Sequence, residues 1–206
     1  GVQTENEDRA KEIFRRGYEQ AQHLQLAYPE KADGYYWYAV NFGEFVERSS
    51  IFTKMAAPGK ITAMAKKVLQ LDPSYDGGGA YLMLGRINQL MPGGDEKLAE
   101  DYFKKSVGYA PNRTTSHLYL AQLYYDEKRY EEAMAEAEIV LSVKPEKRFI
   151  VEYRQDVPEA KQWRAKIAEK LGRHRESRRF SPYGRHHAGV AWIFHPARFK
   201  ISSAQR

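Results

Sequence analysis

Proline divides this sequence into stretches of helical pattern, and the intervals between the prolines limit the folds that the chain can adopt. Pro29, Pro73, Pro111 and Pro145 each follow a run of helix-forming residues, at separations of 44, 38 and 34 residues. Proline lacks the backbone N–H that would continue a helix. A period of roughly 34 residues that ends in proline is typical of stacked helical hairpins. The spacing therefore predicts an all-α repeat protein.

The last unit, residues 117–145, shows how each hairpin would pack. Its apolar positions recur at the three-to-four spacing of amphipathic helices, and "DEKRYEE" forms a polar turn between its two halves. Small residues allow antiparallel helices to approach to ~8–10 Å, so the alanines are predicted contact points. The two apolar faces are Leu120, Ala121 and Tyr124 on the first helix and Ala133, Ala137 and Val140 on the second.

The earlier units repeat this pattern with insertions. Two extra residues fall in "SYDGGGA" and two in "MPGGD", both turn-forming stretches, and ten fall in "EFVERSSIFTKMAAPGK". A single amphipathic helix precedes Pro29, and "VPEAKQWRAKIAEKLGR" predicts a closing helix with Pro158 near its first turn and Gly172 past its end. The pattern resembles the tetratricopeptide repeat over residues 5–145. We therefore predict an all-α, tetratricopeptide-like helical-repeat array of three helix pairs plus a leading and a closing helix.

Composition excludes several classes of protein and site. The 206 residues include no cysteine, which excludes disulfides, thiolate catalysis and cysteine metal sites and leaves the redox compartment open. With 42% hydrophobic and 29% charged residues, the chain has enough apolar residues for a core. The apolar runs are far shorter than the ~20 residues that cross a bilayer, so a soluble protein is expected. Because the chain begins with Gly1, we expect a processed or trimmed N-terminus.

The net positive charge of the chain comes from its last residues. The net charge is +6, yet residues 173–206 hold eight Lys and Arg against the single Glu176. We therefore predict a helical domain over residues 1–172 and a basic, irregular or loosely docked extension over residues 173–206. Three interpretations of this extension stay open: a basic arm for nucleic acid or acidic lipid, a segment that docks "VAWIF" on the bundle, and an extension unrelated to the domain.

The first helix of each hairpin in such an array faces a concave surface that commonly holds a peptide. Helical phase predicts that Tyr36, Val40 and Glu44 project there from the first unit. Arg86 and Gln89 follow from the second unit, and Gln122 and Tyr125 from the third. Mixed aromatic, amide and charged side chains suit an extended peptide or a partner's loop, although an ordinary solvated face would show the same pattern.

The aromatic run "GYYWYAVNF" adds Trp37 and Asn41 to these candidates. Four aromatic residues in one helical turn must point in several directions, so some belong to the core and others could line a ligand cavity. Core packing is the favoured interpretation. Asn41 lies one turn beyond Trp37, where its amide is expected to form a structural hydrogen bond to the neighbouring loop.

No motif indicates catalysis, a metal or a cofactor. "SYDGGGA" lacks the Lys-Ser/Thr ending of a phosphate-binding loop and follows no strand, so its glycines are expected to permit a tight connection. "MPGGDEK" is a turn, with Asp95 as the helix N-cap. The acidic residues of "DEKRYEEAMAEAE" mostly fall on the outward side of a helix, and His23 and His117 stand isolated in the sequence. An enzyme would need convergent titratable groups, and the spacing offers none.

Three stretches resemble the T-component proteins of TRAP transporters: "YYWYAVNFG", "IFTKMAAPGKI" and "VLQLDPSYDGGGAYLMLGRI". The resemblance extends from about Ala10 to Leu171. It implies a tetratricopeptide-like bundle in the bacterial periplasm, lipid-anchored in the full-length precursor, that associates with a periplasmic solute-binding protein. It also implies a homotrimer with a central pore. The regulators of microtubule dynamics share a similar "YW…N" signature.

The resemblance leads to a functional hypothesis that the residues alone do not reach. We expect a non-catalytic periplasmic accessory protein of a TRAP-type uptake system, which engages the solute-binding protein or a peptide segment of it and also a small organic solute. Nucleic acid is a less favoured partner. The alternative is a generic tetratricopeptide-repeat scaffold, cytoplasmic or on a membrane surface, with no transport role.

Overall fold

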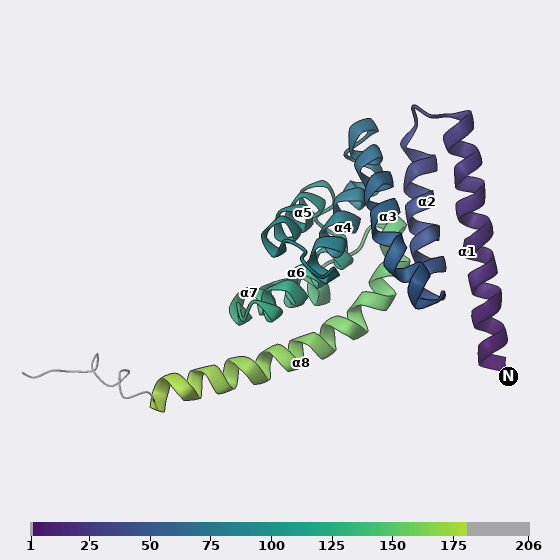
Figure 1. Cartoon of the computed structure of the whole chain (residues 1–206). Coiled ribbons are helices and arrows are strands. Elements are labelled where there is room, and N and C mark those ends of the chain that lie inside the picture. The colour runs from purple at the N-terminus through teal and green to yellow at the C-terminus, as the bar shows by residue number, and fades with distance from the viewer. Residues whose placement is uncertain (1, 181–206) are drawn as a thin grey trace, which may run out of the picture.

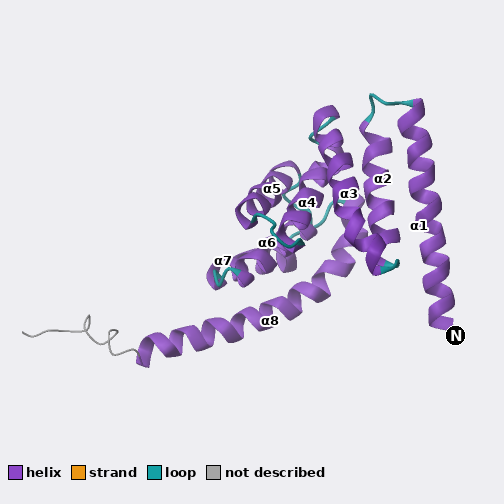
Figure 2. Ribbon diagram, viewed as in Figure 1, coloured by secondary structure: helices purple, strands orange, loops and turns teal. Residues whose placement is uncertain are grey.

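The computed structural model describes the backbone of residues 2–180 and the side chains of residues 6–50, 53 and 56–173. The described residues form eight α-helices and one short 3₁₀ helix, joined by short loops (Figures 1 and 2). The helices are α1 (Val2–Ala27), α2 (Ala32–Glu47), α3 (Ile51–Leu71), α4 (Tyr75–Leu90), α5 (Glu96–Tyr109), α6 (Thr114–Asp126), α7 (Tyr130–Ser142), the 3₁₀ helix η1 (Lys147–Phe149) and α8 (Ile150–Phe180). The prediction of an all-α fold is confirmed.

The helices pack in chain order as a stack of hairpins. Helices α2 and α3, α4 and α5, and α6 and α7 form the three pairs, α1 lies along α2, and α8 packs against α6 and α7 (Figure 1). Each of the four prolines follows the end of a helix by two or three residues. The predicted array of three pairs with a leading and a closing helix is therefore confirmed.

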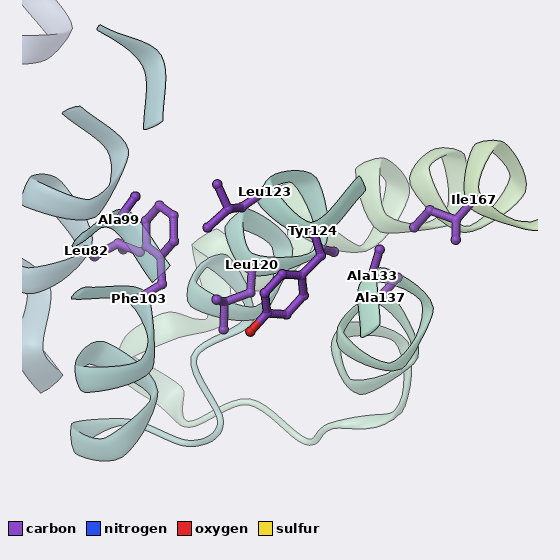
Figure 3. Close-up of a cluster of buried hydrophobic side chains, with 10 residues drawn as sticks. Leu82, Ala99, Phe103, Leu120, Leu123, Tyr124, Ala133, Ala137 and Ile167 are labelled. Carbon is purple, nitrogen blue, oxygen red and sulfur yellow. The ribbon is translucent and has the colours of Figure 1, made fainter. Parts of the chain in front are cut away.

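Small residues bring neighbouring helices into contact, as the spacing predicts. Ala121 on α6 and Ala133 and Ala137 on α7 have no exposed surface. Figure 3 shows the α6 side chains of this core between those of α4 and α5 on one side and the α7 alanines on the other. At Gly85 an added Cβ would come within 2.5 Å of the ring of Phe103. These close approaches define the spacing between the helices.

The insertion in the first unit lengthens helices rather than a loop. Residues 51–60 form the first turns of α3, and Pro58 lies inside that helix. Ala57 beside it is buried in the cluster that contains Phe42 and Val46 of α2. The ten extra residues therefore add packing surface between α2 and α3.

The glycine-rich start of α4 adopts a backbone conformation that most residues avoid. Asp76, Gly77 and Gly78 have φ of 49°, 61° and 73°, in the left-handed region that favours glycine and tolerates aspartate. A Cβ added at Gly77 would lie 2.8 Å from the Cβ of Ala110 and 3.0 Å from the ring of Phe149. The predicted tight connection is confirmed, and it packs against residues that are distant from it in the sequence.

The closing helix is longer than the sequence pattern predicts. Helix α8 begins at Ile150 and continues through Gly172 to Phe180, so the expected end at Gly172 is wrong and Pro158 lies inside the helix rather than in its first turn. Gly172 has no neighbour within 4 Å of an added Cβ, which shows that no turn or close contact uses it. Residues 181–206 of the predicted extension lie outside the described residues, and the boundary of the domain stays a prediction.

None of the helices in residues 2–180 combines the length and the apolar character that crossing a membrane requires.

Candidate partner-binding surface

Hydrogen bonds join the first helices of successive units along one side of the stack. Tyr36 of α2 donates its hydroxyl to the carboxylate of Asp76 at the start of α4. Arg86 of α4 donates to Gln122 of α6 at 2.8 Å, and Gln122 donates to Glu159 of α8 at 2.8 Å. We call the side formed by α2, α4, α6 and the N-terminal half of α8 the inner face. It corresponds to the surface that the sequence predicts for partner binding.

The structure brings three of the predicted residues together at the centre of the inner face. The Nη1 of Arg86 donates to Gln89 as well as to Gln122, both at 2.8 Å. The guanidinium also lies over the ring of Tyr119, 4.3 Å from its centroid, a cation–π contact. These contacts orient Arg86 along the face, and they span two units that the sequence treats separately.

Helix α8 covers the part of the inner face that belongs to the third unit. Glu159 accepts hydrogen bonds from Gln122 at 2.8 Å and from the indole of Trp163 at 3.3 Å. The ring of Trp163 packs edge-on against Tyr125 at 5.2 Å. Because Gln122 is buried, the expectation that it projects from an open surface is wrong. The predicted partner surface is occupied here by the protein's own closing helix.

Two of the predicted residues of α2 are engaged within the fold. Tyr36 is buried between α2 and α4, where burial raises the pKa of its hydroxyl well above the usual range. The prediction that Tyr36 projects from the concave face is therefore wrong, because its ring packs against Gly79, where the missing side chain leaves room for it. Asn41 donates to the carbonyl of Trp37 at 2.7 Å and lies against Gly17 of α1. The expected hydrogen bond exists, but its acceptor is the same helix rather than a loop.

The other α2 residues remain accessible. Trp37 is 47% exposed, Val40 is half-buried, and Glu44 is exposed and pairs with Arg48 at 2.8 Å. Trp37 packs edge-on against Tyr36 at 5.5 Å. Large, half-exposed aromatic side chains of this kind contribute much of the binding energy in protein interfaces.

Tyr75, which the sequence did not single out, extends this aromatic surface onto α4. Its ring lies 5.1 Å from that of Tyr36, and its hydroxyl donates to Asp33 of α2 at 3.0 Å. Burial and the bond to Asp33 raise the pKa of Tyr75 to about 12. The hydroxyl is protonated at neutral pH, as in an ordinary tyrosine, and donates this contact between the units. We define Asp33, Trp37, Val40 and Tyr75 as the aromatic patch.

A row of polar side chains beside the aromatic patch, which begins with Arg113, was also not predicted from the sequence. Arg113, before α6, donates to both carboxylate oxygens of Glu152 on α8, at 2.7 and 3.0 Å. It also donates to the backbone carbonyl of Asp76 at 2.9 Å and to its carboxylate at 3.2 Å. Burial works to lower the pKa of Arg113, but the pairing with Glu152 raises it further, so the net shift is upward. One buried cation thus links α4, α6 and α8.

Asp156 continues this row along α8. It is buried, and its Oδ2 accepts from the hydroxyls of Thr114 at 2.6 Å and Thr115 at 2.7 Å. Burial raises the pKa of Asp156, and the two threonine bonds oppose that shift. The sequence signal for this contact is weak, because two threonines at a helix start are common caps and give no hint of a partner on a distant helix.

The polar groups of residues 6–173 do not form a metal centre. No three His, Asp or Glu side chains among these described residues are arranged to hold a metal ion. The carboxylates of Asp76, Glu152 and Asp156 on the inner face accept hydrogen bonds from tyrosine, arginine and threonine side chains instead.

Comparison with known proteins gives one family and several structures of similar fold. The family described as TRAP transporter T-component matches residues 4–155. A thermophilic TPR protein of Thermus thermophilus, TTC0263, is 17% identical with a TM-score of 0.54, covering 77% of this chain and 73% of its own. Two structures of MamA are 15% and 16% identical with TM-scores of 0.51, and cover 90% and 82% of this chain and 93% and 94% of theirs. A search of curated proteins found no match. At these identities the structures indicate the fold alone.

Proposed function

The chain belongs to the TRAP transporter T-component family, and we propose that it serves a TRAP-type uptake system as a non-catalytic accessory protein that engages the solute-binding protein through its inner face. The proposal includes contact with the transported solute, a periplasmic location with a lipid anchor, and a homotrimer. The family match supports the transport role, and the aromatic patch supports the mode of contact.

The exposed ring of Trp37 is the observation that carries the proposed contact. Trp37 is 47% exposed on α2, whereas α8 already occupies the corresponding part of α6. A partner would therefore lie on α2 and α4, between the aromatic patch and Arg86. Aromatic and arginine side chains are enriched among the residues that dominate binding energy.

The polar side chains beside the patch support a binding role over a catalytic one. Arg113 is matched by Asp76 and Glu152, and Asp156 by two threonine hydroxyls. Groups that satisfy one another in this way hold the helices in position. They would present a rigid surface, which lowers the cost of ordering on binding.

The alternative is a tetratricopeptide-like scaffold with no transport role. A stack of helical hairpins suits many partners, because fold alone does not determine function. The two hypotheses differ in the partner: the first requires a TRAP solute-binding protein, and the second an unrelated assembly.

The test is a binding measurement with purified components. Solute-binding proteins of the TRAP systems encoded in the same genome are titrated against the protein by isothermal calorimetry, with and without bound solute. We expect one of them to bind. Trp37→Ala should weaken that binding at least tenfold, since loss of a central aromatic residue typically costs about 2 kcal/mol or more. Binding of none of them would refute the transport role.

Tyr28→Ala is the matched control for this variant. Tyr28 is 49% exposed, close to the exposure of Trp37, but lies on the turn between α1 and α2 outside the inner face. Its replacement should change affinity less than twofold. Equal losses for the two variants would show that the aromatic patch is not the contact surface.

A further inference from the structure

His117 is a buried histidine with a hydrogen-bond acceptor at each ring nitrogen. It lies on α6 and is 5% exposed. Its Nδ1 is 2.6 Å from the carboxylate of Glu136 on α7, and its Nε2 is 2.9 Å from the carbonyl oxygen of Pro111 in the turn before α6. The sequence shows neither contact: His117 looks isolated, and Glu136 is expected on the outward side of its helix.

The two acceptors determine which form of the ring fits. A neutral imidazole has one N–H and one bare nitrogen, whereas the imidazolium has two N–H donors. The carbonyl of Pro111 can only accept, and an ionised carboxylate at Glu136 can only accept. A neutral ring would therefore leave one of the two contacts without a hydrogen. The geometry calls for the doubly protonated ring.

The surroundings of the ring agree with this form. Burial disfavours a charged imidazole, but the hydrogen bonds to Glu136 and Pro111 outweigh it, and the pKa of His117 is raised. Helices α4, α5, α7 and α8 all pack against α6, and among the described residues of these elements Glu136 of α7 is the charged group that acts on His117. A carboxylate next to a histidine is a common means of moving its titration within the physiological range.

The contacts of His117 join three parts of the stack. The ring lies on α6, its carboxylate partner is on α7, and its carbonyl partner is in the turn from α5. Pro111 lies two residues before Arg113 in the same turn, and Arg113 links Asp76 to Glu152. The position of this turn therefore affects the joint between the second and third units.

We propose that His117 is a proton-dependent link in the stack. When its ring is charged, it holds the turn between α5 and α6 against α7 through its two hydrogen bonds, and when the ring loses a proton, this contact weakens. The inference rests on the contacts of His117 and is independent of the proposed transport role. The bond to Glu136 contributes stability that is fully present below the ordinary histidine value of ~6.5 and is lost as pH rises through the raised pKa of the folded protein.

Two measurements on the full chain test the proposal. In the first, the ring nitrogens are followed by NMR on protein labelled at histidine, with the His117 signals assigned by their loss in His117→Asn. We expect both nitrogens to carry protons at pH 6 and the ring to titrate above ~6.5. A neutral ring at pH 6 would overturn the proposal.

In the second measurement, thermal unfolding is recorded from pH 5.5 to pH 9.5 for the wild type and for Glu136→Gln. This variant keeps the shape of the side chain and the histidine, so folding is retained. We expect its Tm to lie about 2–6 °C below that of the wild type at pH 6, with the gap closing at high pH. Glu131→Gln, an exposed position on the same helix, should show no such pH-dependent gap. A difference in Tm between Glu136→Gln and the wild type that is constant with pH would refute the proposed proton-dependent link.

Discussion

Replacing Arg113 by methionine should destabilise the protein more than any other loss of a single arginine on the inner face. The Arg113 side chain is 4% exposed and makes four hydrogen bonds, two to Glu152 and two to Asp76. Methionine keeps the apolar stem of the side chain and its contact with Phe149, over which the guanidinium lies at 4.7 Å. The change therefore removes the charge and its hydrogen bonds while retaining most of the packing.

The magnitude depends on how far water reaches the two carboxylates. Removing one partner of a fully buried pair typically costs about 3–5 kcal/mol, because the other charge is left without compensation. The side chains of Glu152 and Asp76 are 33% and 29% exposed, and each keeps a hydroxyl donor, from Thr115 and Tyr36. Partial hydration lowers the cost, so we expect about 2–4 kcal/mol at pH 7. A loss of about 3 kcal/mol corresponds to a fall in Tm of roughly 6–12 °C.

The assay is urea unfolding followed by circular dichroism, with the matched control Arg148→Met. Arg148 also lies over Phe149, at 4.5 Å, but its side chain is 48% exposed and, among the described residues, forms an ion pair with Glu146 alone. Its loss should cost less than about 1 kcal/mol. In a double-mutant cycle, adding Glu152→Gln to Arg113→Met should recover part of the lost stability, because it removes the unpaired charge. A cost for Arg113→Met no larger than that of the control would refute the reasoning.

Two further substitutions test the local geometry of the stack. Gly77→Ala should cost about 2–4 kcal/mol in urea unfolding, because the left-handed backbone and the close packing against Ala110 and Phe149 both oppose the methyl group. Gly93→Ala is the control: Gly93 also has a left-handed backbone, with φ of 75°, but has no neighbour within 4 Å, so its replacement should cost only about 1 kcal/mol. Equal costs would mean that packing is not involved. Glu100→Gln should destabilise the protein by about 1–2 kcal/mol at neutral pH, because hydrogen bonds led by Arg129 lower the pKa of Glu100 to about 2. In an acid titration the difference from the wild type should shrink progressively from about pH 5 and disappear near pH 1. A difference at pH 2 as large as that at pH 7 would contradict this account.

Repeat period and residue size were sufficient to predict the fold. The prolines mark the helix ends because their chemistry acts locally, and the alanines mark contacts because only small residues permit close helix packing. The end of α8 was predicted wrongly because a helix can continue through a glycine where nothing requires a turn, as at Gly172. Propensity gives only a weak preference at such a position.

The candidate surface was predictable in part. Helical phase placed Arg86, Gln89 and Gln122 on one face, where the structure joins them by hydrogen bonds. Phase could not show which of Tyr36 and Trp37 is buried, because Gly79, on a different helix, makes room for the Tyr36 ring.

The contacts of α8 with the inner face were also beyond the sequence pattern. The acidic residues of α8 have the pattern of a solvated stripe until Arg113 and Gln122 are placed opposite them. Long-range pairing of this kind leaves no local signal in the sequence.

The placement of α8 against α6 determines where the array can grow. A further hairpin added after α7 would have to displace Ala160 and Ile167, which have no exposed surface. A hairpin inserted between α5 and α6 would instead leave the contacts of α8 with α6 and α7 intact and add one more first helix to the inner face. The length of the surface available to a binding partner is therefore set by the units that precede the hairpin covered by α8, and a designer could lengthen that surface one hairpin at a time.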